Sequence, residues 1–305
     1  MTDAQKKALF DKLVREIMRD IHSHERRSIE RALKLLNELR RDVIVLMAES
    51  GASQFTMSVY RQIKAAIEYR IDDFERELTT SFNKNLSRAF DLGTEMVEKP
   101  SIEALQTPII GISRQPVQVA AAFSAELISS LSIATKEAIN RVLRRAVLGV
   151  LPISDAIKSV GRSLTSAGPF KSLALRAETI VRTEVLRIFS IAAHARMQAS
   201  AKAAQDLGWV LLREWSTAKD RRVRGNKSSD QFSHILAHGQ FRRVDQPFDI
   251  PILLKGIPTG FEQLSYPRDP KGSAANTINC RCAALPRIFR ASEAERVLAQ
   301  SLLAA

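Results

Sequence analysis

Apolar residues recur every three or four positions from the start of the chain, and no Pro or Gly interrupts residues 3–49. This spacing places apolar side chains on one face of an α-helix. We therefore predict one helix over residues 3–49, with Thr2 or Asp3 as its N-cap, about 70 Å long at ~1.5 Å per residue. The apolar face consists of Leu9, Leu13, Ile17, Ile21, Leu33, Leu36, Leu39 and Val43.

A second long helix is predicted from about residue 54 to residue 97. Gly51 can end the first helix and Ser53 can cap the second. Two long helices joined by a short turn form an antiparallel hairpin, so residues 1–98 are predicted to be a long helical hairpin. Its second stripe consists of Val59, Ile63, Ile67, Ile71, Phe74, Leu78 and Phe82.

Residues 99–170 read as a linker followed by further helices. Pro100 is expected to end the second helix, because the residue before a proline disfavours the helical conformation. Pro and Gly between residues 100 and 117 then indicate an extended crossover. Helical patterns return over residues 117–148, 154–164 and 173–207, with Gly149, Pro152 and Gly208 as stop signals.

The pattern changes after Gly208, because short runs rich in apolar and aromatic residues replace the helical spacing. Such runs predict strands over residues 209–215, 241–244 and 278–284. A closing helix follows at about residues 292–303. The predicted fold is a mainly α N-terminal region, followed by a small α+β domain over residues 171–290 and a C-terminal helix over residues 291–305.

Composition restricts the classes of protein that this chain can be. It has 305 residues, 45% hydrophobic and 26% charged, with a net charge of +13, which is typical of globular proteins. The apolar runs are shorter than the ~20 residues of a membrane span, residues 1–25 do not resemble a signal peptide, and two Cys cannot form a disulfide scaffold. The positive charge favours polyanions such as nucleic acid, bound through phosphates without sequence specificity.

Residue types that rarely gather by chance lie in order between Trp215 and Cys282. Trp215 is followed by Ala218-Lys219-Asp220-Arg221-Arg222-Val223-Arg224, then by Ser233-His234, Gly239-Gln240 and Pro247-Phe248. Tyr266-Pro267-Arg268-Asp269-Pro270 and Asn279-Cys280-Arg281-Cys282 complete the series, and Arg182-Thr183-Glu184 precedes it on the last long helix.

This ordered set resembles the phage head morphogenesis domain of the phage Mu F-like minor head proteins, over roughly residues 176–285. Residues 225–232 depart from the family pattern as an insertion. The resemblance implies a structural, non-catalytic minor capsid protein at the portal vertex or inside the head, acting in head assembly and in DNA packaging or ejection. It also implies the portal protein, scaffold or major capsid protein as partners, and places the chain in the virion after synthesis in the host cytoplasm.

The Asp220 and arginine cluster allows two interpretations. A guanidinium pairs bidentately with either a carboxylate or a phosphate. The cluster could therefore be an internal network that fixes a loop, or it could contact DNA. The candidate nucleic-acid-binding residues are Arg221, Arg222, Arg224, Arg242 and Arg243.

A metal site is a further candidate. His234 and His238 are four residues apart and would share a helix face, while Cys280 and Cys282 would share a face of a strand. Two imidazoles and two thiolates make a zinc site. The alternative is a core in which both cysteines are small apolar residues. Some relatives carry additional Cys and His near the Arg222–Arg224 position, which this chain lacks.

Enzymatic alternatives remain open. Arg182-Thr183-Glu184 has the residue types of an ADP-ribosyltransferase, although these normally come from separate strands. His234, Asp220 and Asp269 could supply the acid–base set of a nuclease delivered with the genome. A non-specific DNA-binding protein is a third class. The chain has no Gly-rich phosphate loop with Gly-Lys-Ser/Thr, which excludes a packaging ATPase.

Overall fold

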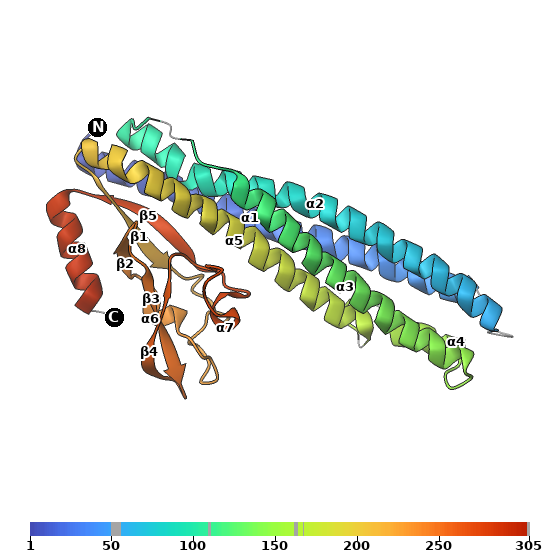
Figure 1. Ribbon diagram of the computed structural model, residues 1–305. Coiled ribbons are helices and arrows are strands. Elements are labelled where there is room, and N and C mark those ends of the chain that lie inside the picture. Colours follow the sequence, from blue (N-terminus) through green and yellow to red (C-terminus); the bar gives the residue numbers. More distant parts are fainter. Residues whose placement is uncertain (50–55, 109–110, 162–163, 167, 304–305) are drawn as a thin grey trace. The chain divides into compact units, whose positions relative to one another are not determined.

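A computed structural model describes residues 1–49, 56–108, 111–161, 164–166 and 168–303. The chain forms two compact units. We call Glu25–Asn85 with Val119–Arg182 the helical unit, and Met1–His24 with Leu86–Gln118 and Thr183–Ala305 the mixed unit. The predicted fold class is confirmed: long helices form the N-terminal part, and a small α+β region follows (Figure 1).

The helical unit is built from segments of α1 (Asp3–Glu49), α2 (Met57–Leu105), α3 (Gln115–Val147) and α5 (Pro169–Asp206), together with α4 (Ile153–Val160). These helices lie side by side (Figure 1). Most of the predicted apolar stripes are buried, from Leu36 of α1 to Phe74 of α2. An ion pair of Asp42 with Arg70 links α1 to α2, and Lys136 of α3 pairs with Asp72. The Gly51 and Ser53 turn lies outside the described residues.

The end of α2 corrects one prediction. The helix continues through Pro100 to Leu105 instead of ending before the proline. An internal proline costs about 3 kcal/mol, but here Val97, Pro100 and Ala104 are all buried. Burial of this apolar end offsets the missing backbone hydrogen bond. Gln106, with φ 59°, then ends the helix.

The mixed unit contains two small sheets. Strands β1 (Val210–Ser216), β2 (Phe241–Arg243) and β5 (Ala283–Phe289) form an antiparallel sheet in the order β2-β1-β5, and β3 (Phe248–Leu254) pairs with β4 (Ile257–Leu264) as a hairpin. The short helices are α6 (His234–Ala237) and α7 (Ala274–Thr277), and α8 (Ala291–Leu303) follows β5. The hairpin was not predicted.

The last strand lies later in the chain than predicted. β5 covers Ala283–Phe289 rather than residues 278–284, and Pro286 is inside it, opposite Arg213. Proline is tolerated there because β5 is an edge strand, whose outer backbone groups need no partner. Asn279 has φ 60° and belongs to the loop between α7 and β5, so the Cys pair is carried by a loop and not by a strand face.

The first turns of α1 contact the last elements of the mixed unit. Both Nη2 and Nε of Arg290 donate to the Asp3 carboxylate, Lys7 pairs with Glu293, and Arg287 bonds Asp11. These pairs connect residues as many as 287 positions apart. The sequence pattern contained no signal for them.

Helix α3 meets a further criterion. It is long and apolar enough to cross a membrane by length and composition, which the lengths of uninterrupted apolar runs did not suggest. A mostly buried core helix passes the same test, but 22% of the apolar window of α3 is buried. In the helical unit α3 packs through Ile128, Leu131 and Ile139, all of which are buried.

Candidate metal centre and the network around it

Three side chains that could hold a metal ion meet in the mixed unit. His234 is the first residue of α6, and Cys280 and Cys282 lie between α7 and β5. Nδ1 of His234 is 3.5 Å from Sγ of Cys280 and 3.3 Å from Sγ of Cys282, and the three ligand atoms lie within 4.8 Å of one another. All three residues are buried and both cysteines are free thiols.

His238 is not part of this group, which corrects the predicted four-residue set. Helix α6 has only four residues, and His238 is its extended C-cap with φ −62° and ψ 131°. The four-residue spacing therefore no longer places the two imidazoles on one face. Instead, Nδ1 of His238 accepts a hydrogen bond from the Thr217 backbone N–H at 3.4 Å.

The orientation of His234 is fixed through its other ring nitrogen. Nε2 of His234 lies 2.6 Å from Oδ1 of Asn276, and Nδ2 of Asn276 donates to the Glu262 carboxylate at 2.5 Å. Because the carboxylate only accepts, Asn276 must present its oxygen to His234, which then donates from Nε2. Nδ1 is left without a proton and faces the two sulfur atoms. Metal-binding histidines are commonly held in this way.

The pKa values of the two buried thiols shift in opposite directions. Burial raises the pKa of the Cys282 thiol well above its usual value, and its hydrogen bond to Cys280 adds to this. Burial also acts on Cys280, but the hydrogen bond from Cys282 opposes it, and the pKa of Cys280 is held well below its usual value. Nη1 of Arg268, itself buried, donates to the carbonyls of both cysteines at 2.8 Å.

Aromatic packing surrounds the three residues. The Trp215 ring meets His234 edge to face at 5.5 Å and Phe248 at 5.3 Å between centroids, which is a favourable arrangement of ring quadrupoles. Gly239, with φ 81°, donates its backbone N–H to the Trp215 carbonyl. The resulting core consists of Trp215, Phe232, Ala237, Phe248, Ile250, Leu264, Cys280, Cys282 and Ala284.

The Arg-Thr-Glu segment is divided between the two units. In the helical unit, Arg182 binds Glu25 and Glu178. In the mixed unit, Thr183 Oγ1 accepts from the Asn279 backbone N–H at 3.0 Å. Glu184 pairs with Arg187 at 2.6 Å, and burial raises its pKa. The threonine therefore ties the leading helix to the cysteine loop.

Asp220 joins the cysteine loop from the other side. Both of its oxygens accept from Arg281 at 2.5 Å, and this hydrogen bonding lowers the pKa of Asp220 to about 2. Arg224 donates to the Ile278 carbonyl, and its own carbonyl accepts from the His234 backbone N–H. Phe232, in the segment between Arg224 and His234, forms an isolated β-bridge with Ile252 of β3.

The five arginines predicted to contact nucleic acid differ in their surroundings. Arg242 is buried and bonds Asp249 at 2.8 Å, and Arg243 pairs with Glu295. Arg221 and Arg222 are exposed. These two exposed residues are accessible to a ligand, whereas Arg242 is committed to its own fold.

The Tyr-Pro-Arg-Asp-Pro segment packs against the leading helix. The Tyr266 ring is 5.0 Å from that of His194, and burial together with Asp269 raises the pKa of Tyr266 to about 12. Asp269 accepts from the backbone of Ser265 and of Lys271. Arg268 donates to Ser190 at 2.5 Å. Pro267, which lies between Tyr266 and Arg268 in the sequence, is also buried.

The proposed nuclease residues have separate partners: Asn276 for His234, Arg281 for Asp220, and the two backbone N–H groups for Asp269. Sequence reasoning missed Asn276, Glu262 and Arg268 as supports of the cysteine site. Arg268 lies inside a recognised motif, but its burial has no signature in spacing. Asn276 and Glu262 come from segments whose pairing depends on the unpredicted hairpin.

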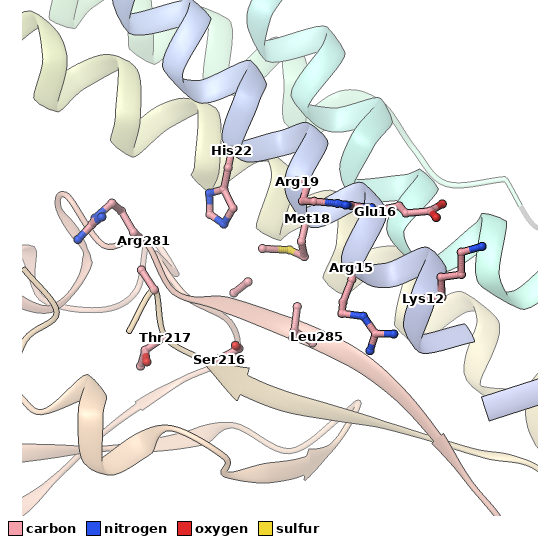
Figure 2. A pocket seen from close by; sticks show the side chains of 12 residues that line it. Lys12, Arg15, Glu16, Met18, Arg19, His22, Ser216, Thr217, Arg281 and Leu285 are labelled. Carbon is pink, nitrogen blue, oxygen red and sulfur yellow. The ribbon is translucent and has the colours of Figure 1, made fainter. Parts of the chain in front are cut away.

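A cleft of about 460 Å³ lies between α1 and the β1–β5 edge of the mixed unit (Figure 2). Figure 2 shows Met18, His22 and Arg15 of α1 directed toward the strand that carries Leu285. The remaining lining residues are Lys12, Glu16, Arg19, Ser216, Thr217, Ala218, Arg281 and Ala283.

Comparison with known proteins gives one relative without an assigned role. YqbB of Bacillus subtilis (strain 168), an uncharacterized protein, is 26% identical over 215 residues, which are 70% of this chain and 62% of YqbB. The chain thus spans less than two thirds of that relative's length. No family model and no solved structure matches. Over 70% of its length the chain is therefore similar to an uncharacterized protein.

Proposed function

We propose that this chain is a phage minor head protein, a structural component at the portal vertex that acts in head assembly and contacts the packaged DNA. One observation carries the proposal. The separate pieces of the head morphogenesis pattern, which are scattered over a hundred residues of sequence, contact one another around a single core.

The contacts follow the pattern piece by piece. Trp215, which begins the pattern, packs on His234 of the Ser-His piece. The Asp220 piece binds Arg281 of the last piece, and Thr183 of the leading helix binds Asn279 beside it. A chance collection of these residue types has no reason to meet in pairs, so the arrangement supports a domain in which the pattern defines the fold.

The helical unit is the part that we assign to docking. Its long helices expose apolar side chains, among them Val119, Phe123 and Ile133 of α3, which are 63%, 45% and 56% exposed. Val119 and Phe123 are one helical turn apart and share a face, and a contiguous exposed apolar patch marks an interaction site. The partner that the resemblance implies is the portal protein, with scaffold or major capsid protein as further partners.

A pull-down with the portal protein encoded in the same genome tests this assignment. We expect the full chain to be retained, and the triple variant Val119→Ser, Phe123→Ser, Ile133→Ser to be retained at least tenfold less. A matched control, Leu254→Ser with Ile257→Ser at the β3–β4 tip, alters residues 64% and 67% exposed and should bind normally. Failure of the unaltered chain to associate with the portal contradicts the proposal.

We further propose that His234, Cys280 and Cys282 bind zinc, supplying three of the four ligands of a tetrahedral site. With Zn–S of about 2.3 Å and Zn–N of about 2.0–2.1 Å, tetrahedral ligands are about 3.4–3.8 Å apart. The N···S separations of 3.5 and 3.3 Å fall close to this range. The deprotonated Nδ1, set by Asn276, supplies the lone pair that a metal needs, and thiolates with imidazole are the donors that zinc prefers.

Metal analysis of the purified full chain tests this second proposal. We expect one zinc per chain, and with Co²⁺ in its place a thiolate-to-cobalt absorption band near the ultraviolet. His234→Gln should abolish the band, whereas His238→Gln, which alters an imidazole outside the group, should retain it. A metal-free chain that takes up no Co²⁺ argues for a core of two packed thiols.

A further inference from the structure

The cleft between α1 and the β1–β5 edge has one strongly basic wall. Lys12, Arg15 and Arg19 follow one another along α1 at intervals of three and four residues, so they share a face of the helix. All three are exposed. Within the described residues none of them forms an ion pair, whereas the nearby Asp11 is bound by Arg287 and Asp220 by Arg281. Glu16 is the one acidic residue of the lining.

The opposite wall and the floor are of different character. Ala218, Ala283 and Leu285, together with Met18 from α1, give an apolar surface, and the hydroxyls of Ser216 and Thr217 lie at its border (Figure 2). An apolar floor beside hydroxyl donors and a row of cations suits a ligand with a flat apolar body and negatively charged groups. The volume of about 460 Å³ is in the range of sites for small molecules and nucleotides.

The spacing of the cations favours a strand over a single anion. Lys12 and Arg19 are seven residues apart on a helix, about 10 Å at ~1.5 Å per residue. A row of about 10 Å is longer than one phosphate group, so it can contact more than one phosphate of a strand. Hydroxyl side chains and arginines are the groups that commonly contact phosphate and sugar, and the chain's charge of +13 attracts a polyanion.

We propose that this cleft binds the phosphate backbone of single-stranded nucleic acid, with Lys12, Arg15 and Arg19 on successive phosphates and a nucleoside against Met18 and Leu285. The site differs from the Arg221–Arg224 and Arg242–Arg243 positions that the sequence suggested. The inference rests on the nucleic-acid contact within the proposed function, but it is independent of portal binding, so each can fail without the other.

Fluorescence anisotropy with a labelled 20-nucleotide oligothymidylate and the full chain provides the test. We expect the triple variant Lys12→Gln, Arg15→Gln, Arg19→Gln to raise Kd at least tenfold and to reduce the slope of log K against log salt by about 2, the value for three lost contacts to a single strand. A control that removes equal charge elsewhere, Lys84→Gln with Lys202→Gln and Lys271→Gln, should change Kd less than twofold. These three lysines are exposed.

A second variant changes the shape of the cleft and leaves its charge unaltered. Ala218→Phe fills the cleft beside its apolar floor and should weaken oligonucleotide binding about tenfold with the salt slope unchanged. Thymidine monophosphate, as competitor, distinguishes a free nucleotide from a strand: competition only at concentrations a hundredfold above those of the oligonucleotide supports the proposal. Equal effects of the cleft and control triples, or equal affinity for the mononucleotide, would overturn it. So would an acidic peptide that binds the cleft while the oligonucleotide does not.

Discussion

At the scale of single residues, buried polar groups of the mixed unit are held in one protonation state by their neighbours. His194 is the clearest case. Burial lowers its pKa from 6.5 to about 4, and the charge of Arg213, whose Nη1 lies 3.2 Å from Nδ1 of His194, adds to the shift. Arg213 itself donates to the backbone carbonyls of Arg243, Gln246 and Ser265. A second positive charge would therefore be poorly tolerated here.

This gives the first prediction, on pH. Because the folded pKa of His194 lies below the unfolded value, the unfolded chain binds more protons between pH 6.5 and 4. Stability is full above pH 6.5 and falls as the pH drops toward 4, by roughly 3 kcal/mol for a shift of this size. His194→Gln should flatten this part of the curve. Denaturant titrations at pH 7.5 and 4.5 measure it, and an equal loss in both proteins would contradict the assignment.

A second prediction concerns Asn276, which holds the imidazole of His234. Asn276→Ala should lower the affinity for the proposed zinc about 10- to 100-fold, because the ligand nitrogen loses its fixed orientation, and should leave a partly buried Glu262 oxygen without its amide donor. Thr277→Ser, in the same helix turn and with its hydroxyl retained, is the matched control. Competition with a chromophoric chelator gives both affinities. Equal affinities would show that Asn276 does not act on the metal ligand.

At the scale of elements, the sequence was most informative where one periodicity persisted. The boundaries of α1 were predicted to the residue and those of α3 to within two residues. A long apolar stripe restricts where the helix can begin and end. Two errors in element boundaries occurred at Pro100 and Pro286. A proline is read as a stop by local rules, but burial at the end of α2 and an edge position in β5 make each tolerable. Both reasons depend on tertiary structure, which the local sequence does not show.

The candidate site was predictable in part for the same reason. The residue types of His234, Cys280 and Cys282 stood out, but the exclusion of His238 depended on α6 ending after one turn. The β3–β4 hairpin was missed because its strands lack strict alternation: β4 is largely exposed, and Pro251 and Gly260 interrupt the apolar runs. Glu262, which orients Asn276, is carried by that hairpin.

A third prediction concerns the contact of α2 with α5 in the mixed unit. A Cβ at Gly93 would lie 2.3 Å from the Phe189 carbonyl oxygen and 2.8 Å from the Ala192 Cβ. Gly93→Ala should therefore destabilise the protein by about 1–3 kcal/mol, since overpacking of backbone outweighs the better helix propensity of alanine. Gly111→Ala, where a Cβ meets nothing within 4 Å, should change stability by less than about 0.5 kcal/mol. Thermal unfolding of both variants decides the matter.

At the scale of the whole molecule, the chain forms two compact units that share continuous helices. Both tryptophans, Trp209 and Trp215, belong to the mixed unit, whereas helical circular dichroism reports on both units. The two signals therefore separate events in the unit that holds the cysteines from events in the chain as a whole.

The fourth prediction uses this separation. Removal of the proposed zinc with a strong chelator should lower the midpoint of unfolding followed by tryptophan fluorescence, because a ligand present at a thousand times its Kd stabilises the folded state by about 4 kcal/mol. The effect should be absent in His234→Gln. A chelator that shifts neither signal in the unaltered chain would be evidence against a structural metal.

The pairs that join the start of α1 to the end of the chain have a consequence for the time course of synthesis. Arg287 and its partner Asp11 are 276 residues apart, and at ~5–20 residues per second the ribosome needs on the order of tens of seconds to make the intervening chain. During this interval Asp3, Lys7 and Asp11 at the start of α1 lack their partners Arg290, Glu293 and Arg287. A ribosome that stalls near residue 280 therefore leaves all three of these ion pairs unformed.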